Sequence, residues 1–217
     1  MTLMIGMVSQ KGGVGKSTLA RLIAREYAQA GWRVKIADLD ISQGTSTDWK
    51  QRREQNSLEP EVAVEPFRTV AQARKVAELY DMMIYDGPPH SMSGTLEISR
   101  SSALTILPTG LALDDLRPTI MLAHELVDNG IPADRILFAM CRVGDRENEI
   151  EEARTYISRA GYACAAGSLP EKTGYRRASD EGKALSEVTY PSLKGRAEEL
   201  AQSIIDTISH QIQEEAV

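Results

Sequence analysis

The stretch SQKGGVGKST (9–18) decides how the rest of this sequence is interpreted. Gly15, Lys16 and Ser17 match the end of the phosphate-binding pattern G-x-x-x-x-G-K-[ST]. Gln10, however, stands where the first glycine of that pattern is expected. The motif is therefore intact at its end and unusual at its beginning.

The residues on either side of this stretch show the context of a phosphate-binding loop. A mostly apolar run at 3–8 predicts a buried strand, and apolar residues at helical spacing over 16–31 predict a helix. The stretch RVKIADLD (33–40) is predicted as the next strand. Strand, loop, helix and strand together form a βαβ unit, whose crossover is expected to be right-handed.

The alternation of strands and helices continues through the chain. Further strands are predicted at 61–66, 82–86, 103–108, 135–143 and 162–170, and further helices at 48–55, 70–80, 113–130, 147–161 and 193–213. Continuously apolar strands between helices favour a parallel sheet that is covered on both sides. We therefore predict a three-layer α/β fold with a mostly parallel sheet, as one P-loop domain over residues 1–217.

Composition excludes several classes of protein. With 42% hydrophobic and 26% charged residues, the 217-residue chain suits a folded domain, and its net charge of −6 gives no global sign of nucleic-acid binding. Cys141 and Cys164 are isolated, which favours buried thiols in a reducing compartment. No export signal and no run of 18 apolar residues is visible, so we expect a cytoplasmic protein.

The glycine-rich loop can surround phosphates because its backbone N–H groups can turn inward at the start of a helix. Lys16 is expected to contact the β- and γ-phosphates, Ser17 to bind Mg²⁺, and Thr18 to reach the α-phosphate. The predicted nucleotide-binding residues are Gly12, Gly13, Val14, Gly15, Lys16, Ser17 and Thr18. The alternative, a flexible glycine-rich turn, does not explain the flanking strand and helix.

Acidic residues follow two of the predicted strands. Asp86 ends the run at 82–86, where a P-loop protein carries an acid that holds Mg²⁺. Asp38 and Asp40 end the run at 33–40, and one of them could reach the metal while the other orients an attacking water. From spacing alone, Asp38 and Asp40 could equally be ordinary turn residues.

The motifs KGGVGKST, DLDISQG and DGPP, in this order, resemble those of the ParA/MinD superfamily of ATPases with a deviant Walker A motif. In that family the first lysine of K-G-G-x-G-K-[ST] crosses the dimer interface to the partner's nucleotide. The second motif of the family is D-x-D-P-Q-G, whereas Ile41 and Ser42 here replace the single proline. One extra residue is therefore expected in this loop.

The resemblance implies a role for each matching position. Lys11 resembles the lysine that acts on the partner's phosphates, Lys16 the ordinary P-loop lysine, and Asp40 the acid that positions the hydrolytic water. Ser17, Asp38 and Asp86 resemble residues at the Mg²⁺ ion. The implied activity is hydrolysis of ATP to ADP and phosphate, coupled to formation of a homodimer.

Within the superfamily, the chain looks most like the small plasmid-type ParA partition proteins. This implies an ATP-dependent dimer that binds DNA non-specifically, associates with the nucleoid, and hydrolyses ATP when stimulated by a centromere-binding, ParB-type adaptor. Such DNA binding should depend on salt. The candidate contacts are Lys172, Arg176, Arg177, Lys183, Lys194 and Arg196, with Lys50, Arg52 and Arg53 as a second basic cluster.

Three alternatives remain open. A related ATPase could position a protein cargo through a different adaptor. A MinD-like protein would bind a membrane, but the acidic end SHQIQEEAV would repel anionic lipid and disfavours that binding. A metabolic P-loop enzyme would leave Lys11 without a role in a partner subunit.

Overall fold

The computed structural model describes residues 2–215, with side chains described as far as Gln213. The acidic pair at 214 and 215, which weighs against membrane binding in the sequence, lies outside the described side chains. Among the described residues, no helix combines the length and the hydropathy needed to cross a membrane.

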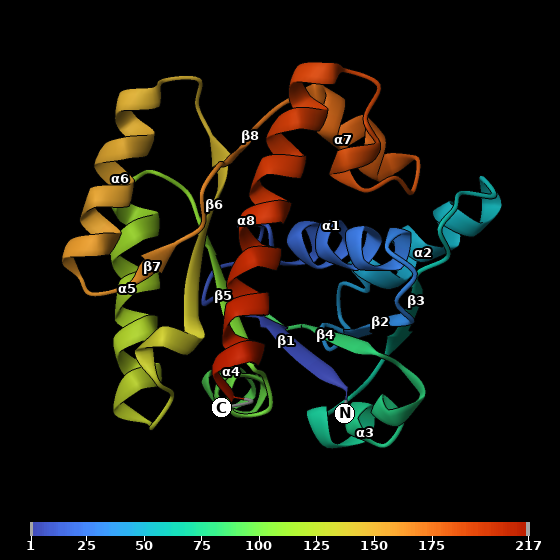
Figure 1. Cartoon of the computed structure of the whole chain (residues 1–217), viewed down its shortest axis with the longest axis horizontal. Coiled ribbons are helices and arrows are strands. Elements are labelled where there is room, and N and C mark those ends of the chain that lie inside the picture. The colour runs from blue at the N-terminus through green and yellow to red at the C-terminus, as the bar shows by residue number, and fades with distance from the viewer. Residues whose placement is uncertain (1, 216–217) are drawn as a thin grey trace.

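A parallel sheet forms the centre of the structure (Figure 1). The strands are β1 (Leu3–Met7), β2 (Val34–Asp38), β3 (Ala63–Pro66), β4 (Met82–Asp86), β5 (Leu104–Thr109), β6 (Ile136–Val143), β7 (Ala163–Cys164) and β8 (Leu169–Pro170). They are ordered β3-β2-β4-β1-β5-β6-β7, and β8 pairs with the far end of β6. All of these pairings are parallel, which confirms the predicted sheet.

Helices cover both faces of this sheet, as predicted. They are α1 (Lys16–Gln29), α2 (Thr45–Gln55), α3 (Val70–Arg74), α4 (Met92–Arg100), α5 (Leu113–Asp128), α6 (Glu147–Arg159), α7 (Thr173–Asp180) and α8 (Pro191–Glu215), with 3₁₀ turns at Ala77–Leu79, Ala133–Arg135 and Leu185–Glu187. One hydrophobic core joins the sheet to α1, α2, α7 and α8, and a second joins it to α3, α4, α5 and α6. In Figure 1, α5 and α6 accordingly lie together, apart from α1 and α8.

Strand alternation explains how one sheet supplies two cores. Ile84 faces the α1 side, whereas its neighbours Met83 and Tyr85 face the α4 side, and the other central strands alternate in the same way. Burial on both faces is why these strands appear in the sequence as unbroken apolar runs.

The register of the central strands fixes the position of the site. β1 and β2 both pair with β4, so that Met7 and Asp38 each lie opposite Asp86. The loops after these strands therefore emerge at the same edge of the sheet, which is where ligands of open α/β sheets bind.

Two predicted elements differ from the observed ones. The strand predicted at 162–170 is divided into β7 and β8, with Gly167 between them at a φ of 75°. The helix predicted at 70–80 ends at Arg74, and only the short 3₁₀ turn Ala77–Leu79 follows it. Both are short segments near an edge of the sheet, where a local pattern is less constrained by packing.

Candidate nucleotide-binding site

The glycine-rich loop connects β1 to α1, in the predicted context. Gly15 immediately precedes the helix with a φ of 117°, and Gly13 has a φ of 74°, so both need the freedom of glycine. A Cβ atom on Gly15 would also lie 3.1 Å from the Cβ atom of Cys141 on β6. The loop is therefore wrapped tightly, and the first N–H groups of α1 remain available for an anion.

Lys16 folds back over this loop. Its side chain is buried, and its Nζ donates to Ser9 Oγ at 3.0 Å and to the carbonyl oxygen of Lys11 at 3.4 Å. Burial lowers the pKa of Lys16, while the nearby carboxylates of Asp86 and Asp40 oppose this shift. A buried ammonium group held by neutral acceptors is well placed to bind phosphate oxygens.

Asp86 ends β4 behind the loop and is 1% exposed. Its Oδ2 accepts a hydrogen bond from Ser46 Oγ at 2.7 Å. Its Oδ1 is buried and has no hydrogen-bond partner among the described residues. Burial raises the pKa of Asp86, and the hydroxyls of Ser46 and Ser17 counter that shift.

These contacts fit a P-loop magnesium site. A hydroxyl from Ser17 and an unpartnered carboxylate oxygen of Asp86 are hard oxygen donors, which Mg²⁺ prefers. Within residues 2–215, no group of three or more His, Cys, Asp or Glu side chains is arranged to hold a metal. Mg²⁺ in nucleotide sites is usually held by one or two protein oxygens together with waters and substrate phosphates, and Ser17 and Asp86 can supply those oxygens.

Asp38 and Asp40 lie in different surroundings. Asp38 is fully buried, and its oxygens accept hydrogen bonds from the N–H of Asp40 at 3.2 Å and from the N–H and Oγ1 of Thr47 at 3.1 and 2.9 Å. Asp40 faces the cavity, and its Oδ1 accepts from Ser42 Oγ at 2.6 Å. Asp38 thus shapes the loop before α2, and Asp40 is the acid presented to a ligand.

Lys11 does not point into the cavity. Its Nζ lies 2.9 Å from Asp115 Oδ1 and also donates to the carbonyl oxygen of Asp114, both at the start of α5. The Lys11 side chain remains 40% exposed. The pair is thus held at the surface beside the glycine-rich loop, and it joins residues that are far apart in the sequence.

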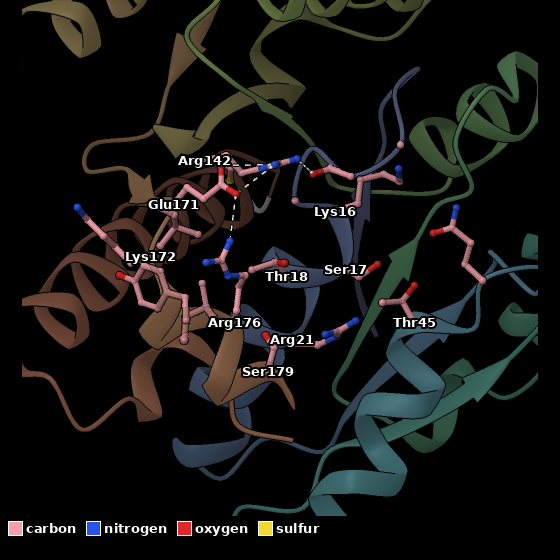
Figure 2. A pocket seen from close by; sticks show the side chains of 18 of the residues that line it. Lys16, Ser17, Thr18, Arg21, Thr45, Arg142, Glu171, Lys172, Arg176 and Ser179 are labelled. Atoms are coloured by element: carbon pink, nitrogen blue, oxygen red, sulfur yellow. Dashed lines mark hydrogen bonds and ion pairs between the residues drawn. The ribbon is translucent and has the colours of Figure 1, made fainter. Parts of the chain in front are cut away.

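A cavity of about 470 Å³ opens over the loop and extends to α7 (Figure 2). Its lining includes all the predicted nucleotide-binding residues except Val14. Gln43 and Pro89, from the motifs DLDISQG and DGPP, also line the cavity. Further lining residues that sequence reasoning missed are Arg21, Thr45, Cys141, Arg142, Leu169, Pro170, Tyr175, Ser179, Asp180 and Leu185. Glu171 and Lys172 also line the cavity, whereas Thr173 does not.

Arg142 links the two sides of this cavity. Its Nη1 donates to the carbonyl oxygen of Gly13 at 3.0 Å, and its Nη2 lies 3.3 Å from Glu171 Oε1 (Figure 2). Arg142 also has a φ of 58°, which is strained for a residue with a side chain. No pattern in the sequence indicates this conformation, because it is set by the end of β6.

The basic residues proposed to contact DNA are mostly paired with acids. Lys172 lies 2.6 Å from Asp145, Lys183 2.6 Å from Glu181, Arg196 3.1 Å from Glu147, Lys194 3.6 Å from Glu198, and Arg176 3.7 Å from Glu171. Lys50 is likewise paired with Glu54. Arg53 is 2% exposed and bonded to Glu187, so including it in a surface cluster was wrong.

A sequence profile of the CobQ/CobB/MinD/ParA nucleotide-binding domain (CbiA) matches residues 5–185. A protein of Sinorhizobium fredii assigned to replication, as replication protein A, is 28% identical over 145 residues. That match covers 65% of this chain and 31% of the relative, so this chain spans about a third of the length of that relative.

Two solved structures show the same fold. MinD of Pyrococcus horikoshii, complexed with Mg-ADP, is 19% identical with a TM-score of 0.74, and the match covers 97% of this chain and 99% of that one. A Borrelia burgdorferi protein assigned to plasmid partition, bound to AMPPNP, is 16% identical with a TM-score of 0.70, covering 95% and 99%. On the strength of the profile match, the chain belongs to the CobQ/CobB/MinD/ParA family of nucleotide-binding domains.

Proposed function

We propose that this protein is a ParA-type partition ATPase that binds ATP with Mg²⁺ and hydrolyses the nucleotide within one domain over residues 1–217. The observation that carries the proposal is the cavity, because it brings Lys16, Ser17 and Asp40 to one space beside the glycine-rich loop. The nucleotide would lie with its phosphates at this loop and its base toward α7.

Each side chain of the site has a defined task in this proposal. Lys16 and the N–H groups at the start of α1 bind the β- and γ-phosphates, and Ser17 and Asp86 hold Mg²⁺ and its waters. The metal, when bound, neutralises charge that develops on the phosphates. Asp40 faces the cavity and orients the attacking water. Asp38 holds Asp40 in position, because its Oδ1 accepts a hydrogen bond from the backbone N–H of Asp40.

Lys11 would couple hydrolysis to dimerisation. In the structure it is bound to Asp115 of its own chain, so it must leave that partner before it can reach the phosphates of a second subunit. An exposed ion pair contributes only about 0–1 kcal/mol, so a nucleotide-bearing partner can displace it. Lys11 would then place a positive charge on the transferring phosphoryl group, as an arginine finger does.

The dimer would bind DNA non-specifically, associate with the nucleoid and release its cargo when a ParB-type adaptor stimulates hydrolysis. The pairing of the basic side chains with acids favours a second candidate, in which the same switch positions a protein cargo. Strong DNA binding to the α7–α8 surface would require several of these pairs to open.

The test is sedimentation and DNA binding without nucleotide, with ADP and with ATP. Wild-type protein should dimerise and bind DNA only with ATP. Asp40→Ala should remain a dimer in ATP, and Lys11→Ala should bind nucleotide without hydrolysing it. Lys75→Ala, which removes an exposed lysine at the end of α3, is the matched control and should behave as wild type.

Two results would contradict the proposal. If ATP changed neither the oligomeric state nor the affinity for DNA, the partition function would be refuted. If Lys11→Ala trapped the ATP-bound dimer, the assigned roles of Lys11 and Asp40 would be wrong. ATP-dependent dimerisation without DNA binding would support the candidate with a protein cargo.

A further inference from the structure

Arg21 is an unusual residue of α1, because it carries a charge into the buried side of the site. It follows Ser17 by four residues and therefore lies on the same face of the helix, where side chains point back toward the N-terminus. It is 5% exposed and lines the cavity. Figure 2 shows its side chain extending toward the region of Ser17 and Thr45.

The contacts of Arg21 lead to the carboxylate of Asp86. Arg21 Nε donates to Ser46 Oγ at 3.4 Å, and Ser46 Oγ donates to Asp86 Oδ2 at 2.7 Å. Arg21 Nη2 and Asp86 Oδ1 are both buried without a hydrogen-bond partner in the part of the chain that the structure describes. Among the described residues, Arg21 Nη2 is thus a donor without an acceptor and Asp86 Oδ1 an acceptor without a donor, and Ser46 lies between the two side chains.

A comparison with Arg53 shows that these open groups are not a general feature of buried arginines here. The Arg53 guanidinium donates to both oxygens of Glu187 and to the carbonyl oxygens of Pro60 and Gly182. Arg21 has only the long bond to Ser46 and a position over the Trp49 ring, at 5.8 Å from its centroid. A purely structural arginine would be expected to be satisfied in the way that Arg53 is.

The charged neighbours of Arg21 are mostly acidic. Burial lowers the pKa of Arg21 to about 10, so the side chain stays charged near neutral pH. The acids Asp86, Asp38 and Asp48 favour that charge, whereas Arg52 opposes it. Lys16 is a second cation near Asp86, but Arg21 is the one joined to its carboxylate through Ser46.

We propose that Arg21 is a positioning residue of the magnesium site, which acts as the internal counter-ion of Asp86 through Ser46 while no metal is bound. The inference rests on the proposed function, because it takes Asp86 to be the acid that holds Mg²⁺. Arg21 keeps the carboxylate oriented through Ser46 in the nucleotide-free protein. It also lowers the affinity of the site for Mg²⁺, because two cations near one carboxylate repel each other.

The first test is a double-mutant cycle measured by thermal unfolding in EDTA. Arg21→Gln should lower the melting temperature, and Asp86→Asn in the Arg21→Gln background should raise it again by about 4 °C. If Arg21→Gln alone does not fold, the double variant should still fold, because Asp86→Asn removes the carboxylate that Arg21 reaches through Ser46. Arg25→Gln, one turn further along α1, is the matched control and should not be rescued by Asp86→Asn.

The second test is ADP binding as a function of Mg²⁺ concentration. Arg21→Gln should lower the half-saturating Mg²⁺ concentration by about tenfold, and Arg21→Lys, which keeps the charge, should stay within about twofold of wild type. Additive effects in the cycle, or a higher half-saturating concentration in Arg21→Gln, would overturn the inference. Failure of wild-type protein to bind Mg-ADP would refute the proposed function instead, and the cycle in EDTA would still decide whether Arg21 compensates Asp86.

Discussion

The ion pair between Arg53 and Glu187 carries a prediction that can be developed in detail. Arg53 lies on α2, and Glu187 lies in the 3₁₀ turn Leu185–Glu187 that follows α7. Their side chains are 2% and 12% exposed, and two hydrogen bonds of 2.7 and 3.0 Å join them. The pair thus connects the helix that carries Ser46 to the wall of the cavity.

The perturbation is Arg53→Met, which preserves much of the volume and removes the charge. Glu187 would keep the N–H of Ala184 at 2.7 Å and the more distant Arg25 at 3.5 Å. Removing one partner of a buried, hydrogen-bonded pair costs about 3–5 kcal/mol. For a chain of this size, that loss lowers the melting temperature by roughly 6–20 °C.

The assay is urea unfolding of Arg53→Met, Glu187→Leu and the double variant. The double variant should cost less than the sum of the single variants, because the second change removes the charge that the first left unpaired. Lys50→Ala removes an exposed ion pair on the same helix and should cost at most about 0.5 kcal/mol. If Arg53→Met cost under about 1 kcal/mol, or if the single variants were additive, the buried pair would not hold these elements together.

Three further predictions concern local features. Gly15→Ala should lower the free energy of unfolding, measured by urea titration, by about 1–3 kcal/mol, because Gly15 has a positive φ and its Cβ would contact Cys141. Gly12→Ala is the control: its Cβ would meet no atom within 4 Å, and the free energy of unfolding should change by less than about 0.5 kcal/mol. Hydrogen bonds from Arg33 lower the pKa of Asp81 to about 2, so an NMR titration should show this value and Arg33→Gln should return it toward 3.8. Because the pKa of Asp81 is lower in the folded state, its stabilising contribution is present above 3.8 and is lost as the pH falls toward 2. Burial raises the pKa of Cys141 to about 12, so iodoacetamide at about pH 8 should modify the folded protein much more slowly than the urea-unfolded protein, and equal rates would contradict this burial.

The central part of the fold could be predicted from the sequence. The strands at 3–8 and 82–86 are mainly apolar runs because both of their faces are buried, and that pattern does not depend on knowledge of the partners. The loop at 9–18 could also be located from the sequence, because the strand before it and the helix after it are recognised from local residue patterns. The two short strands β7 and β8 were predicted as one strand, because the positive φ of Gly167 that separates them cannot be recognised from residue type alone.

The site could be predicted only in part. The glycine-rich loop and the acids at the ends of β2 and β4 converge because parallel strands end at the same edge of the sheet. Their residue types and their positions after predicted strands were therefore enough to predict this part of the site. The wall formed by Leu169, Tyr175 and Ser179 was missed, because these residues reach the cavity only through the packing of α7 against the rest of the structure. The strained backbone of Arg142 was equally invisible.

What the sequence by itself determined is the nucleotide-binding loop, the alternation of strands and helices except for α4, α7 and the break between β7 and β8, and the acids that can serve the loop. Only the tertiary structure decided which charges are free. It bound Lys11 to Asp115, buried Arg53 against Glu187, and left Arg21 with an open donor beside Asp86. The physical reason is that backbone conformation follows from local spacing, whereas the partner of a charge depends on which distant residue the fold brings within hydrogen-bonding distance.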